Sequence, residues 1–88
     1  MEEQRIVLAG EYDLTRKEEL GVLFGSLEGS EPLVIDIEKV TYVDSTALGE
    51  LSALRNRHPR RRITLSGASP NIRRILSLVN FESVFHIT

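Results

Sequence analysis

Residues 33–37, with the sequence LVIDI, constrain the fold of this chain most strongly. The segment is almost entirely apolar and lacks the alternation that a strand with one solvated face would show. A run of this kind is typical of a central strand covered on both faces, as in a parallel sheet. Parallel neighbours require long crossover connections, which are usually helices. The segment therefore predicts an α/β fold with this strand inside the sheet.

Three segments with helical spacing alternate with short strand-like runs. Apolar residues three and four positions apart predict amphipathic helices near residues 15–27, 45–57 and 70–79. Further strands are expected at residues 5–9, 40–43, 61–66 and 84–87, with a polar break at Glu38-Lys39. The expected core consists of Ile35, Ile37, Leu48, Leu51, Ile63, Leu65, Ile72 and Leu76.

The length of the chain limits what it can build. Its 88 residues allow one domain, expected to span residues 1–88, with one modest core. Cysteine is absent, which excludes disulfides and thiolate chemistry. No apolar run approaches the ~20 residues of a membrane span, and the acidic start does not look like a signal peptide. These features predict a cytoplasmic protein without membrane insertion.

Several enzyme classes lack the residues that they need. A nucleophilic Ser45 would require a nearby histidine, but His58 adjoins a proline and His86 lies in a terminal strand. The serine also has no nucleophile elbow, and the chain has no glycine-rich phosphate loop and no metal-ligand spacing. A phosphoaspartate at Asp44 would need a late lysine, and both lysines lie in the first half. We therefore expect no catalytic residue, no metal site and no cofactor.

Residues 40–54 predict a strand, a turn and a helix in direct succession. Asp44 suits the N-cap position, because its carboxylate can accept hydrogen bonds from the first backbone N–H groups of the helix. Ser45 and Thr46 would then present hydroxyl groups to solvent on the first helical turn. From spacing alone, an ordinary helix start is the favoured interpretation of the three residues, because such residues are preferred there in any case.

Two short motifs resemble one known family. Residues 44–49, with the sequence DSTALG, resemble the D-S-[ST]-G-L-G signature of bacterial anti-sigma factor antagonists, which are STAS domains. Residues 10–13, GEYD, are similar to the G-E-[LI]-D motif that closes an early strand in that family. The resemblance covers residues 5–85. It implies a small STAS-like α/β domain with a mixed sheet of about four to five strands and three helices, without the family's C-terminal helix.

The resemblance also implies a function. The unphosphorylated antagonist binds an anti-sigma factor that is itself a serine kinase, and so frees a sigma factor for transcription. The kinase modifies the serine after the motif aspartate, here Ser45 with Thr46 as second choice, and a serine phosphatase reverses the modification. ATP is a substrate of the partner kinase, and this chain itself needs no cofactor. The implied partner-binding residues are Asp13, Asp44, Ser45, Thr46, Ala47, Leu48 and Gly49. Ala47 replaces a family glycine, and whether its methyl group obstructs a close-docking partner stays open.

Other STAS domains imply a different role. Some are subunits docked on the ATPase of an ABC-type lipid transport complex, where they act without a phosphorylation switch. This role is the alternative to the antagonist function. A kinase-like anti-sigma factor or a transporter ATPase encoded nearby would distinguish the two.

The charges divide unevenly between the two halves of the chain. Residues 1–50 hold twelve acidic residues against four basic ones, whereas residues 51–88 hold Glu82 and seven arginines. A nucleic-acid surface is disfavoured, because no aromatic residue lies among the arginines and the net charge is −2. A solvated helix end is favoured, with an acidic protein partner as the next choice. The oligomeric state stays open.

Overall fold

The computed structural model describes residues 2–88 as an alternation of strands and helices. The elements are β1 (Gln4–Tyr12), the 3-10 turn η1 (Leu14–Arg16), α1 (Lys17–Gly25), β2 (Leu33–Val43), α2 (Ser45–Arg57), β3 (Ile63–Ser66), α3 (Pro70–Leu78), the 3-10 turn η2 (Phe81–Ser83) and β4 (His86–Ile87). The predicted small α/β fold is confirmed.

The sheet has the strand order β1-β2-β3-β4, so the predicted central position of residues 33–37 is confirmed. Every strand pair is parallel, whereas a mixed sheet was expected. The reason is that each of the first three strands is followed by a helix. That helix returns the chain to the end of the sheet at which the strand began, so the next strand runs in the same direction. Ile35 of β2 pairs with Ile6 of β1 on one side and with Leu65 of β3 on the other.

Strand β2 continues through Glu38 and Lys39, so the predicted break there is wrong. The strand absorbs the polar pair by shifting register: Val7 pairs with Asp36, but Ala9 pairs with Lys39. A second shift follows Gly10, whose φ of 86° lies in the left-handed region that glycine adopts without strain. Two irregularities therefore let the chain carry solvated residues within one long strand.

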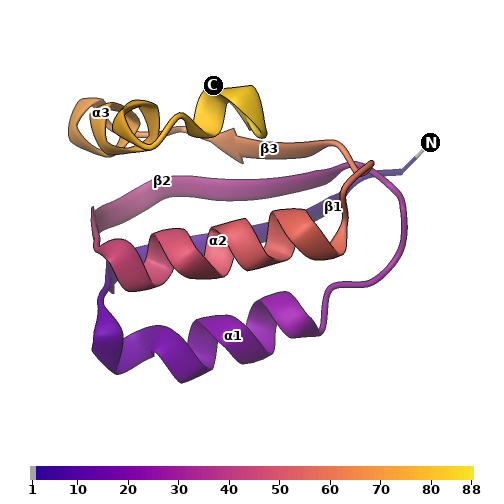
Figure 1. Cartoon of the computed structure of the whole chain (residues 1–88), viewed down its shortest axis with the longest axis horizontal. Coiled ribbons are helices and arrows are strands. Elements are labelled where there is room, and N and C mark those ends of the chain that lie inside the picture. Colours follow the sequence, from indigo (N-terminus) through magenta and orange to yellow (C-terminus); the bar gives the residue numbers. More distant parts are fainter. Residues whose placement is uncertain (1) are drawn as a thin grey trace.

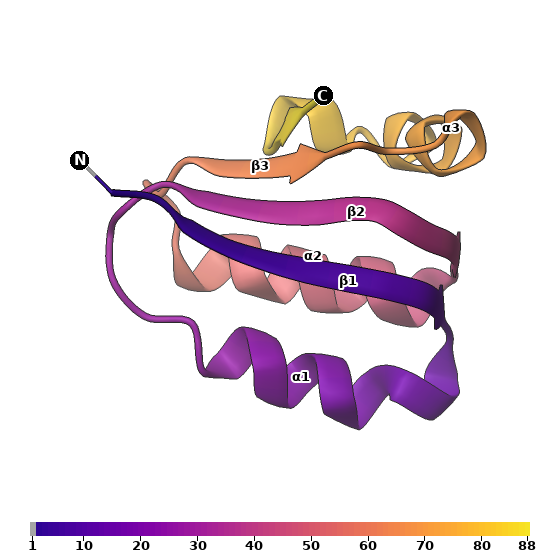
Figure 2. The same cartoon turned by 180° about the vertical axis from the view of Figure 1, so that it is seen from behind.

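All three helices pack on one face of the sheet. Figure 1 shows α2 in front of the strands with α1 beside it, and Figure 2 shows β1 and β2 on the near side with α2 behind them. The buried residues of α3, Ile72 and Leu76, join the same core cluster as those of α1 and α2. Coverage of β2 on both faces was therefore wrong. On the other face of the sheet, Arg5 of β1 and Asp36 of β2 form an ion pair at 3.4 Å.

The predicted core is buried except for Leu48, which is half-buried. Helix α2 instead buries Ala47, Leu51 and Leu54. These positions follow i, i+4, i+7 spacing and form the stripe that meets the sheet. Leu48 lies at the border of that stripe and packs against the core from one side.

Candidate functional site

The two sequence motifs meet at the carboxyl ends of neighbouring strands. Tyr12 and Val43 are the last residues of β1 and β2, and they pair with each other in the sheet. Asp13 and Asp44 follow them directly. The Asp44 N–H donates to the carbonyl oxygen of Tyr12 at 3.2 Å, which ties the two strand ends together. Open α/β sheets tend to place binding sites at this edge.

Asp44 caps helix α2. One carboxylate oxygen, Oδ1, accepts from the backbone N–H groups of Thr46 at 2.9 Å and of Ala47 at 3.3 Å. The predicted cap is confirmed. Ser45 is the first residue of α2 and is exposed, while Thr46 is half-buried. The capping aspartate therefore sets the direction in which α2 presents the Ser45 hydroxyl.

Replacing the cap should weaken the fold measurably. We expect Asp44→Ala to cost about 1 kcal/mol, because two N–H groups lose their acceptor. That loss should lower Tm by about 4–8 °C in a domain of this size. Asp44→Asn keeps an oxygen acceptor and is the matched control. Thermal unfolding followed by circular dichroism measures both, and equal Tm values for Asp44→Ala and the native chain would contradict the cap's role.

Asp13 caps the short turn η1. Its Oδ1 accepts from both the backbone N–H of Thr15, at 2.9 Å, and the Thr15 hydroxyl. These hydrogen bonds, the side-chain one first, lower the pKa of Asp13 below its usual value, so its carboxylate is ionised at neutral pH. Arg16 lies over the Tyr12 ring at 4.0 Å and donates to the Ala9 carbonyl at 2.8 Å. The turn is thereby held against β1.

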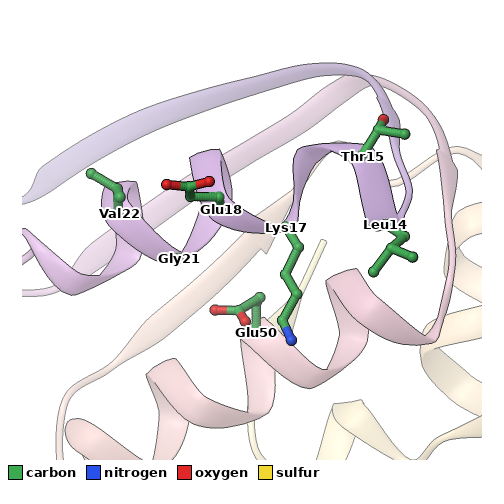
Figure 3. Close-up of a pocket in the computed structure, with 7 residues that line it drawn as sticks. All are labelled: Leu14, Thr15, Lys17, Glu18, Gly21, Val22 and Glu50. Carbon is green, nitrogen blue, oxygen red and sulfur yellow. The ribbon is translucent and has the colours of Figure 1, made fainter.

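Two adjoining hollows lie between α1 and α2 next to these residues. A hollow of ≈ 440 Å³ is lined by Lys17, Ser45, Thr46, Gly49 and Glu50. The other, of ≈ 540 Å³, is shown in Figure 3 and is lined by Leu14, Thr15, Lys17, Glu18, Gly21, Val22 and Glu50. The two share Lys17 and Glu50. The two hollows together are called the groove between α1 and α2, and Ser45 lines one of them.

Sequence reasoning missed the residues that α1 and η1 contribute to this groove. Leu14 and Val22 are 68% and 69% exposed and line the same hollow. Lys17 supplies a cation beside Ser45. Val22 falls outside the apolar stripe of its helix, and that signal could have identified it. Nothing in the sequence placed Lys17 beside Ser45, since this requires knowing that α1 and α2 are neighbours.

The remaining motif residues differ in what they present to solvent. Ala47 is only 3% exposed, so its methyl group faces the core. This burial argues against obstruction of a docking partner by that methyl group. Leu48 is half-buried at the margin. Gly49 is exposed, and a methyl group added there would meet no atom within 4 Å, so the backbone of α2 is open to close approach.

The arrangement suits docking. It combines exposed apolar groups, a lysine, carboxylates and a free hydroxyl at a helix start.

Within residues 2–88, no three His, Cys, Asp or Glu side chains gather closely enough to hold a metal ion. In the same residues, every helix is too short or too polar to cross a membrane.

Comparisons with known proteins place the fold in a family. Residues 1–86 match the family profile described as "Mlab, STAS domain". A STAS-domain containing protein of Pseudomonas aeruginosa is 42% identical over 57 residues, which are 62% of this chain and 56% of that relative, or about half of its length.

Two solved structures share the fold at low sequence identity. A sulfate transporter family protein from Wolinella succinogenes has a TM-score of 0.79 at 15% identity, over 97% of this chain and 75% of that one. The anti-sigma factor antagonist SpoIIAA in its unphosphorylated form has a TM-score of 0.70 at 18% identity, over 96% of this chain and 76% of that one. With the profile match across nearly its whole length, the chain belongs to the STAS domain family.

Proposed function

We propose that this chain is an anti-sigma factor antagonist switched by phosphorylation of Ser45. The observation that carries the proposal is the exposed Ser45 at the start of α2, directly after a capping aspartate and beside the paired strand end that bears Asp13. SpoIIAA, an antagonist by its description, shares the fold. The role is that of a binding module without catalysis, acting in the bacterial cytoplasm.

The groove between α1 and α2 supports the proposed docking surface. A kinase-like anti-sigma factor would cover the apolar Leu14 and Val22 and approach α2 closely at Gly49. Asp13 lies at the same edge and is ionised, so it would face a cationic group on the partner. Ser45 would then lie inside the contact, where the partner's active site can reach its hydroxyl. A serine phosphatase would restore the binding form.

Phosphate mapping tests this proposal. We expect incubation with the cognate kinase and ATP to add one phosphate, which mass spectrometry of proteolytic fragments should place on Ser45. Ser45→Ala should abolish the modification because no other hydroxyl is as exposed at this helix start. Thr46→Val is the control and should still be modified. A phosphate on Thr46, or its persistence in Ser45→Ala, would show that the site is wrong.

A second candidate is a subunit that docks on the ATPase of an ABC-type lipid transport complex. The observation that favours it is the matching profile, whose description names Mlab rather than an antagonist. This role would use the same groove without a switch. Stable copurification with a transporter ATPase, unaffected by Ser45→Asp, would support it, whereas ATP-dependent release from a kinase partner would support the antagonist.

A further inference from the structure

A second groove lies at the other end of α2, between its C-terminal half and the segment from α3 to β4. It consists of two adjoining hollows of ≈ 380 and ≈ 280 Å³. Both are lined by Arg55, Asn56, Ser83 and Val84. Arg55 lies ten residues along α2 from Ser45, which is about 15 Å at 1.5 Å per residue, and no residue lines both grooves. The two surfaces are therefore distinct.

Two arginines fix the shape of this second groove. The Arg55 guanidinium donates to the carbonyl oxygens of Val84 at 3.0 Å, of Arg61 at 2.6 Å, and of His58. Arg61 is 5% exposed, and its guanidinium donates to the carbonyl and the carboxylate of Glu31 at 2.6 and 2.9 Å. Their hydrogen bonds hold the loop after α2 and the segment between η2 and β4 in place, so the walls are preformed.

Other arginines on the groove are free to bind a ligand. Arg60 and Arg62 line the larger hollow and are exposed. Neither forms an ion pair with any of residues 2–88, and no carboxylate lines either hollow. Two carboxylates lie near this end of the fold: Glu31 pairs with Arg61 at 2.9 Å, and Glu82 accepts a hydrogen bond from Ser77 at 3.3 Å. The charges of Arg60 and Arg62 are therefore the ones that no ion pair within residues 2–88 compensates.

The smaller hollow adds two exposed apolar side chains. Val79 and Val84 line it and are 42% and 44% exposed. A cationic rim that continues into exposed valines matches a peptide with both acidic and apolar side chains. Nucleic acid fits poorly, because the local aromatic residues, Phe81 and Phe85, are buried and offer no platform for base stacking.

We infer that this groove binds an extended acidic segment of a partner protein. Carboxylates of the segment bind Arg60 and Arg62, whose planar guanidinium groups suit two-oxygen contacts. An apolar side chain of the segment covers Val79 and Val84. Arginines that merely lie in solvent at a helix end would not require a concave surface. Here the hydrogen bonds of Arg55 and Arg61 form such a surface. The inference is independent of whether Ser45 is phosphorylated.

The test uses the whole chain and a fluorescent eight-residue peptide of alternating glutamate and leucine. Fluorescence anisotropy at low salt measures binding, with a glutamine–leucine peptide as the neutral control. We expect binding of the acidic peptide only, with amide chemical-shift changes at Asn56, Ser83 and Val84. Arg60→Glu/Arg62→Glu should weaken binding at least about tenfold, because the rim charges are reversed. Salt should weaken it as well, since the pairs are exposed.

A matched variant separates the groove from overall charge. Arg73→Glu/Arg74→Glu changes the net charge equally on exposed positions of α3 that do not line the groove. It should change the affinity for the peptide by less than about twofold, because exposed charges that lie away from the contact are screened by salt. Equal losses in both double variants, no binding of the acidic peptide, or tighter binding of a single-stranded oligonucleotide would overturn the inference. So would concentration-dependent self-association through the same residues, which would assign the groove to a second copy.

Discussion

A phosphate on Ser45 is expected to lower the affinity for the kinase partner by at least about 100-fold while changing Tm by less than about 5 °C. The partner would have to desolvate the phosphate or leave it facing like charge in the docking groove. Isothermal titration with phosphoserine incorporated at position 45 measures the affinity, and calorimetric unfolding of the same sample measures Tm. This outcome would establish a switch that acts on the interface alone.

The small stability effect follows from opposing local charges. A phosphate carries about −1.5 to −2 charge at pH 7. The N-terminus of α2 favours a nearby anion by roughly 0.3–1 kcal/mol, whereas the adjacent Asp44 repels it by about 1 kcal/mol at ~4 Å in water. Lys17, which lines the same hollow, adds an attractive partner. These contributions nearly cancel in the free domain.

A charge added elsewhere serves as the control. Ser30 is exposed in the loop between α1 and β2, at the opposite edge of the sheet. Ser30→Asp should leave partner affinity unchanged within about twofold, because a single exposed charge is screened over this distance. If phosphorylation at Ser45 unfolds the domain, or leaves the affinity intact, the switch acts differently from the proposal.

Hydrophobic periodicity was sufficient to predict the architecture but not the rotation of each helix. Apolar runs and stripes report which residues are buried, and they identified β2 as central and all three helices. The stripe of α2 was wide enough to include Leu48, yet the sheet contacts the helix along Ala47, Leu51 and Leu54. Only the tertiary packing decides which part of a wide stripe is covered.

The site could be predicted only where chain order determines position. Asp13 and Asp44 follow neighbouring parallel strands, so their proximity follows from the topology. The groove beside Ser45 depends instead on α1 lying next to α2, and local spacing carries no information about that contact. For the same reason, local spacing does not distinguish the buried Arg61 from its two exposed arginine neighbours.

Arg61→Ala is expected to be among the most destabilising single changes in this fold. The side chain is 2% exposed and links the segments at which β1, β2 and β3 begin, since its guanidinium bonds Glu31 and also the side-chain oxygen of Gln4 at 2.7 Å. Truncation removes three hydrogen bonds and leaves a cavity, for a loss of about 2–4 kcal/mol. In a domain of this size, that loss lowers Tm by about 10–30 °C.

Two further variants separate the contributions of Arg61. Its Nη1 is buried without a hydrogen-bond partner within residues 2–88, which offsets part of the guanidinium's benefit. Arg61→Met keeps most of the apolar stem and removes that unpaired group, so it should lose less stability than Arg61→Ala. Arg62→Ala, at the exposed neighbour, should change stability by no more than about 0.5 kcal/mol. Urea unfolding of all three measures the order, and an Arg61→Ala loss as small as that of Arg62→Ala would mean that the buried guanidinium contributes nothing to the fold.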